Sequence, residues 1–131
     1  MYAVEKSREA VRLLRENRRK FRADGIRIIE GEAPEALREL EPPTHVFIGG
    51  SSGRLREILQ EVRRKNPQAR IVINAVSLET VEEVMQAEKA GLLEQLEVTQ
   101  MTVSRARQAG THHLMTGMNP VYIFSAGGGK E

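Results

Sequence analysis

The sequence contains no cysteine, which excludes disulfide bonds, thiolate catalysis and cysteine-ligated zinc sites. It also has no apolar run approaching the ~20 residues that a helix needs to cross a bilayer. Residues 1–6 lack the hydrophobic region of a signal peptide. We therefore expect no membrane partner and a cytoplasmic location.

Aromatic residues are scarce, at 4% of the chain, and this scarcity bears on nucleic-acid binding. Residues 6–22 carry eight basic side chains and two glutamates, although the net charge of the whole chain is only +2. Such a run is typical either of a polyanion-binding face or of a solvated helix surface. Because Phe21 is the only aromatic residue in the run, there is no stacking platform for bases, and we expect no nucleic-acid partner.

The apolar pattern of the 131 residues predicts one soluble α/β domain over 1–126, followed by a flexible tail over 127–131. The expected strands are 2–4, 26–29, 46–49, 70–74, 96–105 with a bend near 99–100, and 121–124. The expected helices are 7–20, a short one from Pro34, 54–65 and 77–90, and residues 110–120 are expected to form a loop. This alternation predicts a mostly parallel sheet with helices on both faces and a C-terminal antiparallel hairpin.

One stretch stands out within this pattern, the run HVFIGGSSGRL at 45–55. It reads as a strand, a glycine-rich turn and the start of a helix. In open α/β sheets ligands bind at the carboxyl ends of the strands, and the free N–H groups of a helix start favour an anion. The same pattern also occurs where a turn is merely tight, so the residues alone leave both interpretations open.

Several stretches together resemble one family. They are YAVEK at 2–6, GEAPEAL at 31–37, FIGGSSG at 47–53, INAVSLET at 73–80, VSRA at 103–106 and MNPV at 118–121. The combination is similar to the decarboxylating precorrin methyltransferases of cobalamin biosynthesis, the CbiT/CobL C-terminal type. The resemblance implies the Rossmann-like fold of class I S-adenosylmethionine (SAM) methyltransferases. It also implies that this chain lacks the first strand and the glycine-rich SAM loop, so that the domain is partial.

The resemblance implies roles for particular residues, with SAM as the cofactor. The cofactor-binding set is Glu5, Lys6, Glu32, Ala33, Gly49 and Gly50. The set facing a carboxylate-rich precorrin is Ser51, Ser52, Gly53, Asn74, Arg105, His112 and His113. The two histidines are expected in a loop, where an ordinary exposed position is an equally good interpretation. No third ligand accompanies them, so we expect no metal site, and no general base is evident.

The implied function is SAM-dependent C-methylation of a precorrin tetrapyrrole, with loss of a carboxyl group. Absence of a central strand would leave two open sheet edges, between the strand ending at Glu5 and the strand ending at Gly49. We therefore expect a second copy or a complementing chain at these edges. Two alternatives stay open: a non-catalytic Rossmann-like binding or assembly module, and an RNA methyltransferase using the basic helix at 6–22.

Overall fold

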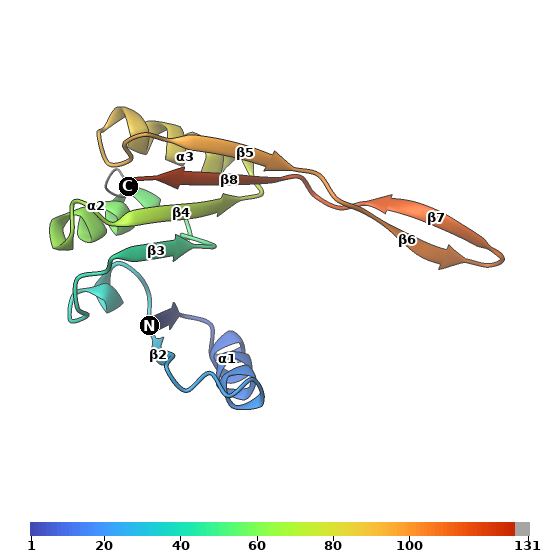
Figure 1. Ribbon diagram of the computed structural model, residues 1–131, viewed down its shortest axis with the longest axis horizontal. Coiled ribbons are helices and arrows are strands. Elements are labelled where there is room, and N and C mark those ends of the chain that lie inside the picture. Colours follow the sequence, from blue (N-terminus) through green and yellow to red (C-terminus); the bar gives the residue numbers. More distant parts are fainter. Residues whose placement is uncertain (128–131) are drawn as a thin grey trace. The chain divides into compact units, whose positions relative to one another are not determined.

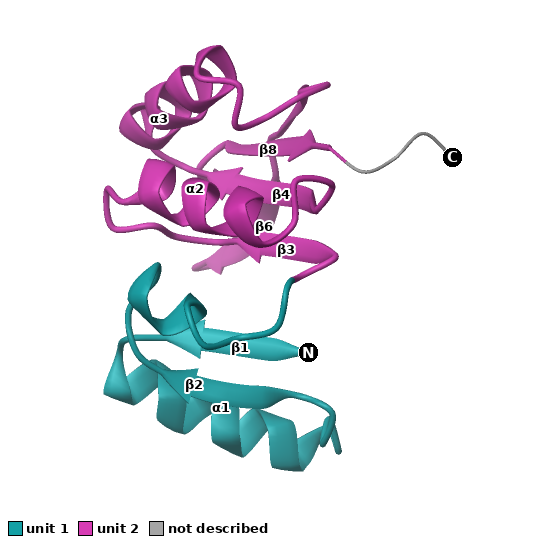
Figure 2. Cartoon of the chain, turned by 90° about the vertical axis from the view of Figure 1, so that its left-hand side faces the viewer, with its two compact units in different colours: residues 1–42 teal, residues 43–131 magenta. Residues whose placement is uncertain are grey.

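The computed structural model describes residues 1–127. The chain divides into two compact units, Met1–Pro42 and Pro43–Glu131 (Figure 2). The first unit holds β1 (Tyr2–Glu5), α1 (Arg8–Lys20), β2 (Arg27–Glu30) and a single 3-10 turn at Glu35–Leu37. The short helix predicted from Pro34 is therefore only this one turn.

In the first unit, β1 and β2 form a parallel pair whose register runs from Tyr2 opposite Arg27 to Glu5 opposite Glu30. Helix α1 begins where the Ser7 hydroxyl accepts a hydrogen bond from the Ala10 amide at 3.3 Å, a standard N-cap. Val11, on its apolar side, is 1% exposed. The unit thus presents the carboxyl ends of two strands at one edge.

The basic residues of α1 are partly neutralised inside the first unit. Arg12 contacts Glu9 and Glu16, at 3.2 and 3.5 Å. Glu30, at the end of β2, lies within 3.9 Å of Arg8 and 3.7 Å of Arg15. These exposed pairs contribute little stability individually, but they are typical of a solvated helix surface rather than of a free polyanion-binding face.

The second unit is built on a four-stranded sheet of order β3-β4-β8-β5 (Figure 1). Its elements are β3 (His45–Ile48), α2 (Leu55–Lys65), β4 (Arg70–Ala75), α3 (Leu78–Lys89), β5 (Glu97–Met101) and β8 (Val121–Ala126). β3 and β4 are parallel, whereas β8 is antiparallel to both β4 and β5, so the antiparallel pairing predicted for the last two strands is confirmed. β1 and β3 are not hydrogen-bonded to each other, and this break separates the two sheets.

The core of the second unit lies between the sheet and its two helices. Alternate residues of β4 and β8 are buried on one face of the sheet, and they meet the apolar side of α2 and part of α3. The most buried side chains are Leu55, Leu59, Ile71, Ile73, Val84, Leu93 and Phe124. Because α2 and α3 also contact each other, both cover the same face of this sheet.

The prediction of one long strand over 96–105, with a bend near 99–100, is wrong about the bend and about where the strand ends. β5 pairs with β8 in regular register through Thr99 and Gln100, so there is no bend at that point. The strand instead ends at Met101, and a separate strand begins at Ser104. β5 therefore carries apolar side chains on both of its faces, and Val98 and Met101 are each about half exposed.

The loop predicted over 110–120 is also wrong, because most of it is a strand. β6 (Ser104–Ala109) and β7 (His112–Gly117) form a two-stranded antiparallel hairpin that is a separate sheet. Its turn is Gly110-Thr111, and Gly110 has a φ of +63°, as two-residue hairpin turns require. Every side chain of the hairpin except that of Ala109 is exposed. Because the hairpin has no buried face, its sequence shows no alternation of apolar and polar residues that would predict β7.

Arg63, on α2, links three segments of the second unit through hydrogen bonds. Its guanidinium donates to the backbone carbonyls of Leu92, Pro67 and Ala69 at 2.8, 2.9 and 2.7 Å. A Cβ on Gly127 would lie 3.0 Å from the same guanidinium and 2.9 Å from the Ala69 carbonyl, so only glycine fits there. Burial lowers the pKa of Arg63, and the negative charge of Glu94 opposes this shift.

We expect Arg63→Ala to destabilise the protein by about 2 kcal/mol, because three backbone acceptors lose a charged donor. Arg63→Lys keeps the charge but lacks the planar fork, and recovers only part of this loss. Urea unfolding followed by circular dichroism measures both. Arg64→Ala is the matched control, since Arg64 only pairs with Glu61 at the surface. If the Arg63 and Arg64 variants are equally stable, the hydrogen bonds from Arg63 to the three backbone carbonyls contribute nothing to the stability of the protein.

Candidate functional site

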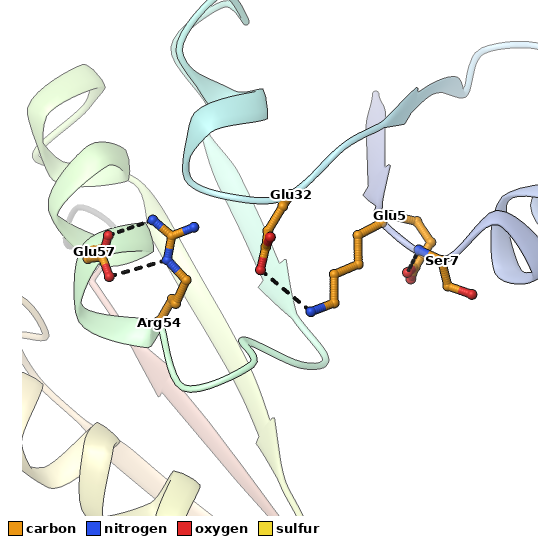
Figure 3. A network of polar contacts seen from close by, with 6 residues as sticks. Glu5, Ser7, Glu32, Arg54 and Glu57 are labelled. Carbon is orange, nitrogen blue, oxygen red and sulfur yellow. Dashed lines mark hydrogen bonds and ion pairs between the residues drawn. The ribbon is translucent and has the colours of Figure 1, made fainter.

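A first candidate site, in the first unit, is the edge where β1 and β2 end. The Glu5 carboxylate closes β1, and its Oε1 accepts a hydrogen bond from the Ser7 amide at 2.8 Å (Figure 3). A carboxylate offers about four acceptor positions, so this bond leaves capacity for a ligand's hydroxyl groups. The Glu5 carbonyl accepts from the Gly31 amide at 3.0 Å, which fixes the segment after β2 beside the end of β1.

Lys6 and Glu32 face each other at this same edge. Lys6 Nζ lies 3.5 Å from Glu32 Oε1, and both side chains are about half exposed (52% and 47%) (Figure 3). Ala33 follows directly and leads into Pro34, which is buried. A Cβ on Gly31 would lie 3.1 Å from Ala36 Cβ, so glycine permits the close return of the chain here. The structure thus gathers Glu5, Lys6, Glu32 and Ala33 at one edge, and their cofactor-binding role stays a prediction.

A second candidate site, in the second unit, is the loop between β3 and α2. Gly49 and Gly50 follow β3, and Ser52 and Gly53 both have left-handed backbone angles, φ +51° and +76°. A Cβ on Gly50 would meet nothing within 4 Å, whereas one on Gly49 would lie 3.3 Å from the Phe47 ring. The chain's own packing therefore does not require glycine at position 50, and the backbone there is open to a ligand.

The start of α2 already has a carboxylate beside it. The Leu55 amide, the first of the helix, donates to Glu83 Oε2 of α3 at 3.3 Å. Arg54, the N-cap residue, makes a bidentate pair with Glu57 through its Nε and Nη2, at 3.3 and 2.7 Å (Figure 3). The anion preference expected at this helix start is thus met in part by the chain itself.

Glu83 was not identifiable from the sequence, because nothing in its spacing separates it from the other glutamates of α3. We expect Glu83→Ala to cost about 1 kcal/mol of stability, the usual value of a helix cap. Chemical unfolding measures this cost. Glu82→Ala is the matched control, since the neighbouring Glu82 is exposed. If the two variants are equally stable, the contact with Leu55 contributes nothing.

Asn74 lies in β4 between two buried residues, and its side chain therefore belongs to the other face of the sheet. On that face its partner in register is Ile123 of β8. Asn74 is half-buried, and the face that it shares is the one without α2 and α3. The substrate-binding role implied for it stays a prediction.

The hairpin carries the last three residues implied in substrate binding. Arg105 lies on β6, and His112 and His113 lie on β7 rather than in a loop. Arg105 pairs with Thr116, Ala109 with His112, and Gln108 with His113. Since successive strand residues alternate between faces, His112 shares the face of Arg105, whereas His113 points to the opposite side. The structure thus separates the two histidines.

Over residues 1–127, no group of three or more histidine, aspartate or glutamate side chains is placed to hold a metal ion. No helix in this same range is both long and apolar enough to cross a bilayer.

The sequence and the fold of this chain are similar to those of known proteins. A sequence profile described as the precorrin methyltransferase domain matches residues 1–127. This chain belongs to the precorrin methyltransferase domain family. A curated relative from Pyrobaculum calidifontis, named Probable cobalt-precorrin-6B C(15)-methyltransferase (decarboxylating), is 36% identical over 128 residues. That alignment covers 96% of this chain and 65% of the relative, so the chain spans about two thirds of the relative's length.

Solved structures of family members show the same fold. The precorrin-6Y C5,15-methyltransferase of Geobacter metallireducens superposes with a TM-score of 0.85 at 34% identity, over 96% of this chain and 67% of that one. A structure described as precorrin 8W decarboxylase from Methanobacterium thermoautotrophicum gives 0.85 at 30% identity, over 96% and 68%. The Rossmann-like methyltransferase fold predicted from the sequence is therefore confirmed.

Proposed function

We propose that this chain forms part of a SAM-dependent methyltransferase that methylates a precorrin carbon and removes a carboxyl group in cobalamin biosynthesis. Membership of the precorrin methyltransferase domain family, over residues 1–127, is the observation that carries the proposal. The names of the relatives given above describe a methyltransferase, a decarboxylase or both. SAM would supply an activated methyl group, and the protein's main task would be to align donor and acceptor.

The residues at the edge of the first unit suit the nucleoside part of SAM. The Glu5 carboxylate, held by Ser7, would accept hydrogen bonds from the ribose hydroxyls, as an acidic residue at a strand end does in dinucleotide sites. Lys6, Glu32 and Ala33 lie beside it and would line the adenine. In the second unit, Gly49 and Gly50 would let the backbone approach the methionine end of SAM.

The acceptor side of the second unit suits a substrate rich in carboxylates. We infer that Ser51, Ser52 and Gly53 present backbone and hydroxyl donors to it, and that Asn74 adds an amide. The Leu55 amide, the first of α2, already donates to Glu83. We therefore infer that the donors of residues 51–53 contribute more to substrate binding than the N-terminus of α2 does. No residue is assigned as a general base.

Isothermal titration calorimetry with SAM and with S-adenosylhomocysteine tests the cofactor assignment. We expect both to bind, with competition between them. A chain that binds neither, and that elutes as a stable dimer by light scattering, would instead support the non-catalytic assembly module. The RNA-methyltransferase alternative has less support, because several arginines of α1 pair with glutamates of the same unit.

We also propose that the enzyme is cytoplasmic and that it works as a homo-oligomer or with a complementing chain at the open sheet edges. β1 and β3 are not paired with each other, and unpaired strand edges readily accept another chain. Light scattering at several protein concentrations tests this proposal. A monomer at all concentrations that also binds SAM would contradict it.

A further inference from the structure

The loop between β3 and α2 ends in a tight turn that places a serine in a strained conformation. The Arg54 amide donates to the Ser51 carbonyl at 2.9 Å, and the residues between them, Ser52 and Gly53, have φ of +51° and +76°. A four-residue turn with positive φ at both central positions is a type I′ turn, in which glycine, asparagine and aspartate dominate. Other side chains are strained there, because the left-handed region brings Cβ too close to the next carbonyl oxygen.

The left-handed angle of Ser52 has no explanation in a helix ending. Over residues 1–127, three residues other than glycine have positive φ: Arg22, Ser52 and Gln95. Arg22 follows the end of α1, and the next amide, of Ala23, donates back to the Arg18 carbonyl at 2.9 Å, as at many helix ends. Ser52 instead precedes a helix. A strained residue of this kind persists only where the surrounding structure holds it.

The start of α2 is held from another helix and not by its own sequence. Arg54 is the N-cap residue, a position where serine, threonine, aspartate or asparagine usually accepts a hydrogen bond from the first turn. An arginine side chain has no acceptor, and this one pairs with Glu57 instead (Figure 3). The first helical amide, of Leu55, donates to Glu83 Oε2 of α3 at 3.3 Å. A carboxylate of α3 therefore caps α2.

Glu83 is fixed in place by the packing of α3. The residue itself is half-buried, and the next one, Val84, is fully buried, at 0% exposure. Leu55 is also 0% exposed, and α2 and α3 contact each other. The Leu55 amide comes one residue after the Arg54 amide that closes the turn. A shift of the helix start would therefore disturb the turn directly.

We propose that Glu83 is a positioning residue, which holds the strained turn at Ser51–Arg54 through the Leu55 amide and so fixes the loop that begins at Gly49. This inference rests on the proposed function, which assigns that loop to ligand binding. Glu83 acts without touching the ligand. A loop that is ordered before the ligand arrives loses less conformational entropy on binding, so the contact favours ligand binding as well as stability.

Hydrogen exchange of the Arg54 amide, followed by NMR in the full 131-residue chain, measures the turn without any ligand. Glu83→Ala should accelerate this exchange about tenfold, because the turn opens more often without its anchor. In Glu83→Gln the amide oxygen still accepts from Leu55, so exchange should stay within about twofold of the wild type. Glu82→Ala, at the exposed neighbouring position, is the matched control and should leave the exchange unchanged.

The strain at Ser52 gives a sharper test. Ser52→Gly removes the left-handed penalty, so in that background Glu83→Ala should accelerate exchange of the Arg54 amide by less than about threefold. Gln95→Gly relieves the same kind of strain outside the loop, at a φ of +53°. It should therefore leave the full effect of Glu83→Ala in place. A residue that only caps a helix would give additive effects in both backgrounds.

The same cycle applies to catalysis in an enzyme that also contains the first strand and the glycine-rich SAM loop. There Glu83→Ala should lower kcat/KM for precorrin methylation about tenfold, and less than about threefold in the Ser52→Gly background. Additive effects of the two changes, or unchanged exchange in a folded Glu83→Ala protein, would overturn the positioning role. A wild-type enzyme that methylates no precorrin would contradict the proposed function, whereas an active wild type with an equally active Glu83→Ala variant would overturn only this inference.

Discussion

In an enzyme that also contains the first strand and the glycine-rich SAM loop, replacing Glu5 by alanine is expected to weaken SAM binding by about 100-fold or more. The Glu5 carboxylate ends β1 and is oriented by the Ser7 amide at 2.8 Å, and in the proposed function it would accept hydrogen bonds from the two ribose hydroxyls. Hydrogen bonds to a charged group contribute about 1.5–3 kcal/mol each, and about 1.4 kcal/mol corresponds to a tenfold change in affinity. Calorimetric titration with SAM measures the effect.

Two further variants make this result specific. Glu9→Ala removes a nearby exposed carboxylate that pairs only with Arg12 in the structure, and should leave SAM affinity unchanged. Glu5→Gln retains one acceptor oxygen and should fall between the wild type and Glu5→Ala. Thermal unfolding without ligand shows whether loss of the Ser7 contact also destabilises the fold. Wild-type SAM affinity in a folded Glu5→Ala protein would remove Glu5 from the site.

The second large effect is expected from Phe124→Ala, with a loss of about 3–5 kcal/mol in the free energy of unfolding. Phe124 is 1% exposed, in β8, and its neighbours in register are Ile73 and Val98. Domains of this kind are stable by only about 5–15 kcal/mol, so the variant would lose much of its stability.

Phe47→Ala is the matched control for this prediction, since Phe47 is the same residue type in the same sheet but is 65% exposed. We expect it to cost less than about 1 kcal/mol, a typical value for a surface position. Urea denaturation followed by circular dichroism compares the two variants. If Phe47→Ala is as destabilising as Phe124→Ala, the buried side of the sheet has been assigned wrongly.

Much of the fold could be predicted from the sequence where one face of an element is buried. The stripe of Leu55, Ile58, Leu59 and Val62 specified α2, and each of these residues is buried. The apolar run of β4 was equally informative. Ser77, a typical N-cap residue, directly precedes α3, and its hydroxyl accepts a hydrogen bond from the Thr80 amide.

The hairpin could not be predicted, because its strands have no buried face and hence no apolar alternation. In the sequence alone, Gly110 and the two histidines are typical of a loop. In the structure Gly110 belongs to a two-residue turn, and the histidines lie on the strand that follows it. The candidate site shows a similar limit. Glu5, Lys6, Glu32 and Ala33 were found through a family resemblance, whereas Glu83 reaches Leu55 only through the packing of α3 beside α2.

The most direct test of the proposed function is mass spectrometry of a precorrin substrate after incubation with SAM and the protein. The precorrin should gain one methyl group and lose one carboxyl group as carbon dioxide, with S-adenosylhomocysteine formed in equal amount. The reaction should slow strongly in Glu5→Ala and should proceed in Glu9→Ala. A precorrin of unchanged mass, from a folded protein that also fails to bind SAM, would contradict the proposed function.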